Sequence, residues 1–414
     1  MNLFLDLFAV IAILGNVVVS IKSIEKGLLI ALLVKPLIDM GWDFNIGPFS
    51  LIDVHTIFFL LIGYLFIIRR SLFKVMNRFI LITWLIAHFG LLFGFIQFPG
   101  NSFDGLARML FLPLGLVILP YFWFNSKTRK KLINYLLLGS LLPSLIILFQ
   151  VAGFLPTETV RMTKGFVRMN GFYHDIVTSR MYILQGLLVL FVVYKLNVFK
   201  IRFSIKLIIL MILLVAGFFL YSKAFVGIVL LGFGFFIITQ RSKFSIIIIP
   251  LLILPVFIMF SDTVLPTVEQ MFVSEIEYNQ GELSDSSRLF SGRGSIWNEY
   301  LNDFNQSSFL TQLIGFNKND GRTHNEFLRI TILSGLIGLL AYLFFFLTLI
   351  RKVVSTYIHK RELMFISVWL ISIMLLDSIS VVWGLYPQYL LVFMGFMIIS
   401  FKHPKTDNNS HLRQ

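Results

Sequence analysis

The sequence SGRGSIW at residues 291–297 and the sequence RTHNEFLR at residues 322–329 mark the one long hydrophilic segment of an otherwise apolar chain. This segment covers residues 261–323, and long apolar stretches lie on both sides of it. Polar, irregular backbone is not tolerated where it faces lipid, so such a segment lies outside the hydrocarbon core. The chain is therefore predicted to be a membrane bundle with one large polar loop.

The composition indicates the same class. The 414 residues are 57% hydrophobic and 14% charged, whereas soluble domains have about 25% charged residues. Apolar stretches of about 18 residues or more recur, which is long enough to cross a bilayer and too long for a barrel strand. The predicted fold class is all-α, a polytopic membrane helix bundle of about 12–13 transmembrane helices with a long extracytoplasmic loop.

Length and hydropathy place the spans near residues 3–20, 26–41, 51–69, 79–96, 105–124, 132–154, 176–195, 203–221, 223–239, 244–260, 324–350, 362–381 and 385–401. The N-terminus lacks the basic region and cleavage site of a removable signal, so we expect a retained first helix. The predicted division is a transmembrane bundle, a large loop with an amphipathic helix, C-terminal transmembrane helices and a tail, at residues 1–260, 261–323, 324–401 and 402–414.

Basic residues give the orientation. They follow every odd-numbered span, at Lys22, Lys26, Arg69, Arg70, Lys74, Arg78, Lys127, Arg129, Lys130, Lys131, Lys195, Lys200, Arg202, Lys206, Arg241, Lys243, Arg351, Lys352, Lys360, Arg361, Lys402, Lys405 and Arg413. Cytoplasmic loops carry such an excess, so the C-terminus is predicted to be cytoplasmic and residues 261–323 extracytoplasmic. These loops also account for most of the net charge of +14 without a nucleic-acid partner.

Other basic residues lie in outer loops or near the outer ends of spans, where an anionic ligand would explain them. Arg168 follows Arg161 and Lys164 in one loop, and Arg180 lies about one turn into the seventh span. Arg binds phosphate bidentately, so Arg168 and Arg180 are predicted phosphate ligands. Solvated loop charge explains Arg161 and Lys164 equally well. Lys223, in the short Ser222-Lys223 connection, either joins them or snorkels to the surface.

The polar loop supplies a further cation. Arg293 lies between two glycines, ahead of a predicted amphipathic helix with apolar positions Ile296, Trp297, Tyr300, Leu301 and Phe304. The glycines would give its backbone the freedom to move onto a phosphate. Acidic residues outnumber basic ones in the loop, so it is not a general polyanion-binding surface. Trp297 is read as a packing anchor.

His324 is the candidate catalytic base, because imidazole takes a proton near neutral pH and a helix N-terminus attracts phosphate. A lone His is more often structural, but this one stands among arginines beside the polar loop. Glu326 or Asp377 would orient it or share its role, and Arg322 and Arg329 would bind phosphate.

Other polar residues receive structural or no roles. Lys35 and Asp39, four residues apart, are predicted to form a structural pair, and His55 and His88 are given no role. The chain has no cysteine, which excludes disulfides and thiolate chemistry. No motif with metal-ligand or nucleotide-binding spacing is present, so no metal and no cofactor are predicted.

The order of these motifs resembles the O-antigen ligase and polysaccharide polymerase superfamily of bacterial membrane glycosyltransferases. The matching positions are Arg168, Gly171, Phe172, Ser222, Lys223, Gly292, Arg293, Trp297, His324, Asn325 and Leu328. The resemblance implies a metal-independent enzyme in which His324 activates the acceptor and Arg168, Arg180, Arg293 and Arg322 bind pyrophosphate. The chain departs from the family pattern at His174-Asp175-Ile176, where many members have His-Pro-Asn, and at Lys223, where Arg is common.

The expected function is a polymerase that joins undecaprenyl-diphosphate-linked oligosaccharide repeat units into O-antigen, capsule or exopolysaccharide at the outer face of the bacterial inner membrane. The alternatives are a ligase that moves the glycan to lipid A core or protein, and a lipid-linked sugar transporter. Divergence of the motifs favours the polymerase, and a transporter would need charges through the full membrane depth. The implied partners are the lipid-linked oligosaccharides, the bilayer, a chain-length regulator and a flippase.

Overall fold

The computed structural model describes residues 2–238 except 48, 98–104, 158–161, 164–165, 197 and 199–200, residues 266, 269–273, 276–277 and 280, and residues 289–402 except 360. Within these ranges, six helices are long and apolar enough to cross a membrane, and a bent helix pair would make a seventh. Four shorter apolar helices accompany them. The predicted all-α membrane bundle is therefore confirmed, whereas the predicted span at 244–260 lies outside the described residues.

The N-terminal bundle consists of helices joined by short connections. Its helices are α1 Asn2–Lys22, α2 Ile24–Met40, α3 Leu51–Arg69, α4 Arg78–Ala87, α5 Gly90–Gln97, α7 Phe111–Phe124, α8 Ser126–Val151, α9 Ile176–Leu196, α10 Phe203–Phe218 and α11 Lys223–Ile238. Two short antiparallel hairpins interrupt them, β1 Asn45–Ile46 with β2 Phe49–Ser50, and β3 Met162–Thr163 with β4 Phe166–Val167.

Local sequence signals explain several boundaries. α3 begins in a capping box, in which Ser50 Oγ accepts from the Asp53 amide and the Asp53 carboxylate accepts from the Ser50 amide, so two free donors of the first turn are satisfied. α8 begins at Ser126, so the basic residues at 127–131 form its first turns instead of the predicted loop. Lys35 Nζ lies 2.8 Å from Asp39 Oδ1 in the interior, which confirms that predicted pair.

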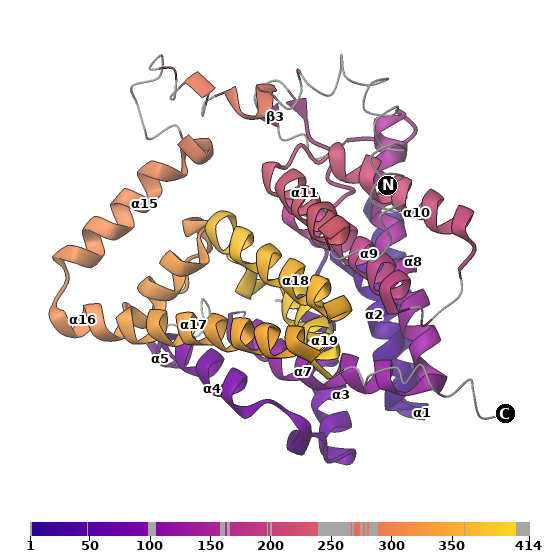
Figure 1. The fold of residues 1–414 in the computed structure, drawn as a ribbon, viewed down its shortest axis with the longest axis horizontal. Helices are drawn as coiled ribbons and strands as arrows, with labels where there is room; N and C mark the ends of the chain where they lie inside the picture. The colour runs from indigo at the N-terminus through magenta and orange to yellow at the C-terminus, as the bar shows by residue number, and fades with distance from the viewer. Residues whose placement is uncertain are drawn as a thin grey trace.

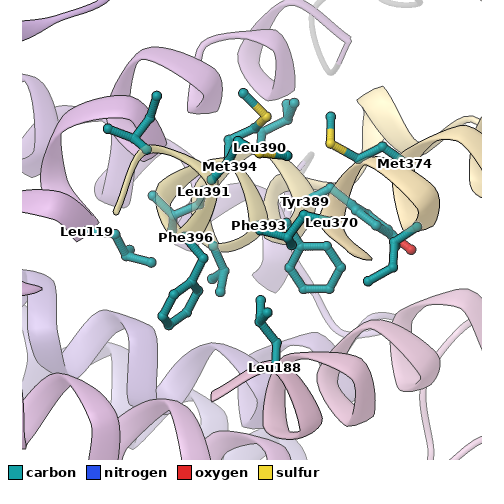
Figure 2. Packing of buried hydrophobic residues seen from close by; sticks show 14 of the residues in the cluster. Leu119, Leu188, Leu370, Met374, Tyr389, Leu390, Leu391, Phe393, Met394 and Phe396 are labelled. Carbon is teal, nitrogen blue, oxygen red and sulfur yellow. The ribbon is translucent and has the colours of Figure 1, made fainter. Parts of the chain in front are cut away.

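The C-terminal segment runs from the edge of the bundle into the core. It comprises α15 Leu289–Gln306, α16 Phe309–Ile314, the 3₁₀ turn η3 Gly321–Thr323, α17 Glu326–His359, α18 Arg361–Ser380, η4 Trp383–Leu385, the π-helical η5 Tyr389–Phe393 and α19 Met394–Lys402. Figure 2 shows η5 and the start of α19 packed between Leu119 of α7, Leu188 of α9 and Leu370 of α18. A Cβ at Gly115 would lie 2.0 Å from Leu390 O, so glycine permits this close approach of α7 to η5.

Two predicted spans are broken. α4 and α5 meet at a 48° bend after Ala87. α17 leaves helical geometry at Gly335, where φ is 62° and ψ is −162°. A Cβ there would lie 2.3 Å from Leu313 O of α16, so this conformation and this contact both require glycine. We call residues 326–334 and 336–359 the first and second limbs of α17.

The polar loop contains a helix where the sequence predicts one. In Figure 1, α15 (orange) lies at the edge of the bundle, and α16 turns back to meet α17. Phe304 of α15 is buried against Leu328 and Ile332 of the first limb, with Trp297 and Tyr300 beside them. α15 begins at Leu289, however, so Arg293 and both flanking glycines are helical. The prediction that Arg293 stands in a flexible stretch ahead of the helix is wrong.

Candidate active site

Arg180 on α9 is held by groups from two other segments. Its side chain is buried, one terminal nitrogen donates to Asp377 Oδ1 of α18 at 2.5 Å, and the other donates to Ser222 Oγ at 3.2 Å. Asp377 is also fully buried and accepts a hydrogen bond from the Tyr389 hydroxyl of η5. The Ser222-Lys223 motif therefore contributes its serine to Arg180. Among the described residues, Arg180 Nε has no hydrogen-bond partner.

Arg293 reaches the same place from α15. Its guanidinium donates to Ser380 O at 2.7 Å, and Ser380 Oγ lies 3.4 Å from Asp377 Oδ1. Burial lowers the pKa of Arg293, and the positive charges of Arg180 and Arg168 lower it further. We call Arg168, Arg180 and Arg293 the arginine cluster. Because arginine stays protonated at physiological pH, their proximity creates a demand for negative charge.

The loop that carries Arg168 is fixed by hydrogen bonds along its length. The Met169 amide donates to Phe219 O at the end of α10, and the Gly171 amide donates to Gln150 Oε1 of α8. Gly171 has φ 65°, a conformation that glycine adopts without strain. The residues that follow the β3–β4 hairpin are therefore tied to α8 and α10, which explains how Arg168 is positioned between them.

Asp175 ends this loop and caps α9. Its Oδ1 accepts from the Thr178 amide at 2.7 Å, and its Oδ2 accepts from the Tyr386 hydroxyl at 2.9 Å. An N-cap carboxylate satisfies free amides and suits the positive end of the helix. The departure from the family pattern at this position thus has a local structural role. Arg108 donates to Leu385 O at 2.9 Å, beside Tyr386, which brings a further cation near the cluster.

His324 lies at a separate turn, to which α15 provides the link. The side chain of His324 is exposed, and its backbone has the left-handed conformation with φ 45°. α17 starts at Glu326, two residues later than predicted. The Trp297 indole donates to Thr323 O at 2.7 Å. Arg293 and Trp297 are four residues apart on α15, about 6 Å along its axis. One face of α15 therefore contacts both the arginine cluster and the turn that carries His324.

Arg322 forms an ion pair with the carboxylate of Asp320. Its terminal nitrogen lies 2.7 Å from Asp320 Oδ2, and Asp320 also accepts from the Tyr300 hydroxyl. Burial acts to raise the pKa of Asp320, but the hydrogen bonds from Arg322 and Tyr300 outweigh it and lower that pKa. Burial and the bond to Asp320 raise the pKa of Tyr300 to about 12. Arg322 is thus placed in an exposed ion pair beside the His324 turn.

Glu326 and Arg329 form a buried network with His88. Both side chains are fully buried, and Arg329 donates to the two Glu326 oxygens at 3.0 and 2.5 Å. Arg329 also donates to Asn319 Oδ1 at 2.9 Å and lies 2.8 Å from His88 Nε2. His88 Nδ1 faces Trp84 O at 3.0 Å. A carbonyl only accepts and a guanidinium only donates, so Nδ1 carries the proton and Nε2 accepts.

Lys223, the other predicted phosphate ligand, follows Ser222 in the chain and has its ammonium 4.9 Å from the centre of the Phe272 ring. Arg161 and Lys164 lie outside the described residues. No group of three or more His, Asp or Glu side chains in the described ranges is arranged to hold a metal ion. Arg168, Arg180 and Arg293 could be predicted from the sequence. Their hydrogen-bond partners could not: no local pattern indicates that Ser222 binds Arg180, that Ser380 O binds Arg293 or that His88 contacts Arg329. The same is true of the bond from Tyr389 to Asp377.

No protein-family model matches the chain, and a search of curated proteins finds no significant match. The arrangement of these side chains is therefore the basis for assigning a function.

Proposed function

We propose that the protein is a polysaccharide polymerase that joins oligosaccharide repeat units carried on undecaprenyl diphosphate. The supporting observation is the arginine cluster, in which Arg168, Arg180 and Arg293 come from three distant segments and the positive charges of Arg168 and Arg180 help to lower the pKa of Arg293. Planar guanidinium groups bind phosphate oxygens bidentately. A lipid-linked pyrophosphate is an anion of the kind that would relieve this repulsion.

The cluster would act on the leaving group. In the proposed reaction, the bond between the anomeric carbon and the pyrophosphate oxygen breaks, and the oxygen of an acceptor hydroxyl bonds to that carbon. Negative charge develops on the departing pyrophosphate, and preorganised cations in a site of low dielectric stabilise such charge strongly. Asp377 and Ser222 would keep Arg180 oriented for this task.

His324 would take the proton of the acceptor hydroxyl. Its exposed turn is joined through Trp297 to the same helix that carries Arg293. A general base contributes about 10²–10⁴-fold to a rate. Glu326 is bound on both oxygens by Arg329, so in our proposal it supports the start of α17 while His324 alone serves as the base.

The proposal includes an orientation. The arginine cluster and α15 would face the outside of the bacterial inner membrane, and the C-terminus would lie in the cytoplasm, as the distribution of basic residues predicts. A chain-length regulator and a flippase would then work beside the enzyme on the same lipid-linked units.

Arginine substitutions test the proposal. The purified protein in lipid nanodiscs receives an undecaprenyl-diphosphate repeat unit, and product length is read on a gel. We expect Arg293→Ala to abolish polymer and Arg293→Lys to rescue it poorly, because the planar fork is lost. Arg70→Ala, which removes an exposed cation paired with Glu25, is the control and should leave polymer unchanged. Wild-type polymer from Arg293→Ala at normal abundance would rule out the proposed pyrophosphate site.

A further inference from the structure

Two large apolar side chains are exposed in the segment that the sequence assigns to the polar loop. Phe309 is 74% exposed and Leu310 is 63% exposed, and both belong to α16. No residue of α16 is buried. The polar face of α15 next to it, at Asn302 and Asp303, is exposed as well. α16 therefore presents apolar surface where the adjoining helix presents polar surface.

The contact between α16 and α17 shows how deep the end of α16 lies in the membrane. Gly335, which touches the end of α16, lies sixteen residues before Arg351, the first basic residue after the span. At 1.5 Å per residue this is about 24 Å, less than the hydrocarbon thickness of about 30 Å. A tilt of the helix shortens the distance along the membrane normal further. With Arg351 at one interface, the break lies within the acyl region of the opposite leaflet.

Backbone amides around the break have hydrogen-bond partners within the protein, as a position inside the hydrocarbon core requires. The Phe316 amide donates to Ile332 O at 2.7 Å, and the Gly315 amide donates to Thr311 O at 2.7 Å. Irregular backbone is tolerated at membrane depth when its polar groups find partners within the protein. Just past the break, Leu336, Ile337 and Leu340 are exposed on the second limb, as lipid-facing residues of a span are.

We propose that α16 is inserted in the outer leaflet, with Phe309 and Leu310 in contact with acyl chains. The occupant of this surface is the bilayer, because α16 joins the second limb at Gly335, within the acyl region, where the limb itself exposes large apolar side chains. α16 is thus a re-entrant turn in which the loop at 261–323 returns to the membrane before α17 begins. This role is separate from any catalytic function.

The inserted turn also fixes α15. Gln312 Nε2 of α16 lies 3.2–3.3 Å from three carbonyls at the end of α15, those of Phe304, Asn305 and Ser307. Helix C-termini leave such carbonyls without intrahelical partners, so Gln312 makes a rigid corner of the two helices. Anchoring α16 in lipid therefore sets the position of α15 over the bundle.

Site-specific spin labelling tests the insertion. The chain has no cysteine, so Phe309→Cys or Leu310→Cys carries a single nitroxide, and both positions are exposed enough to accept it. The labelled protein is placed in vesicles of phosphatidylethanolamine and phosphatidylglycerol, and collisions with oxygen and with a water-soluble nickel chelate are compared. Leu340→Cys serves as the lipid-facing reference and Asn302→Cys as the aqueous one.

We expect both α16 probes to follow Leu340→Cys, with oxygen collisions exceeding those with nickel several-fold. Probes that follow Asn302→Cys would place α16 in water and overturn the insertion. Probes shielded from both reagents would mean that a second copy or another protein covers the surface, which would equally overturn it. The double substitution Phe309→Glu and Leu310→Glu should raise the mobility of a nitroxide at residue 302, and unchanged mobility would refute the role of lipid in fixing α15.

Discussion

Removing both charges of the Glu326–Arg329 pair should destabilise the protein by much less than the sum of the losses from removing each charge alone. The two side chains are fully buried and joined by hydrogen bonds of 2.5 and 3.0 Å. Loss of one partner from a buried pair leaves an uncompensated charge and costs about 3–5 kcal/mol. Glu326→Gln and Arg329→Met should each lose about that much stability.

The double variant Glu326→Leu with Arg329→Met buries no charge. Its remaining deficit comes from Asn319 Oδ1 and His88 Nε2, which lose the Arg329 donor. An unsatisfied buried group costs about 1–3 kcal/mol. The double variant should therefore lose much less stability than the sum of the losses of the two single variants. Arg70→Met, which removes a cation that is 54% exposed and paired with Glu25, is the matched control and should change stability little.

Unfolding in mixed micelles of sodium dodecyl sulfate and a mild detergent measures these differences, with polymer synthesis measured on the same preparations. If Glu326→Gln were as stable as the wild type and yet inactive, the network would not be structural. Glu326 would then have the catalytic role that its place beside His324 suggests from the sequence, and the buried geometry would have been misread.

Three further results are expected. His324→Gln should lower turnover by about a hundredfold or more with donor binding nearly unchanged, and wild-type turnover and pH profile in this variant would remove His324 from the mechanism. Asp320→Asn should destabilise the protein near neutral pH, because the folded-state pKa of Asp320 is lowered. The contribution of the Asp320 carboxylate to the free energy of unfolding is complete above its unfolded pKa of about 3.9 and is lost as the pH falls through the lower folded-state pKa. Thermal unfolding of the variant and of the wild type, compared across pH, would detect this difference. A cysteine introduced at Asn279 should react with an impermeant thiol reagent in intact spheroplasts, and labelling only after lysis would reverse the proposed orientation.

The sequence predicted the helical class and several elements well, because their signals are local. The span predicted at 51–69 coincides with α3, since a capping box and a basic end delimit this helix. Within the stripe from Ile296 to Phe304, Trp297, Tyr300 and Phe304 pack against the first limb of α17 as the spacing predicts, whereas Leu301 is exposed. Spacing of four residues was also enough to pair Lys35 with Asp39.

The failures share a different cause, which is contact between distant parts of the chain. The break at Gly335 follows from its contact with Leu313 O across a turn, and apolar periodicity continues straight through it. His88 and Arg329 are 241 residues apart, so no spacing rule could join them. The start of α15 was placed late because Gly292 and Gly294 resemble a helix boundary, although both lie inside the helix.

The meeting of Gly315 and Gly335 makes the placement of α15 depend on two residues that lie outside it. A Cβ on either glycine would lie within 2.6 Å of backbone atoms of the other segment. A larger residue at either position would therefore push α16 away from the break in α17. Since Gln312 joins α16 to the end of α15, α15 would move with it, and Arg293 would be carried away from Ser380 O.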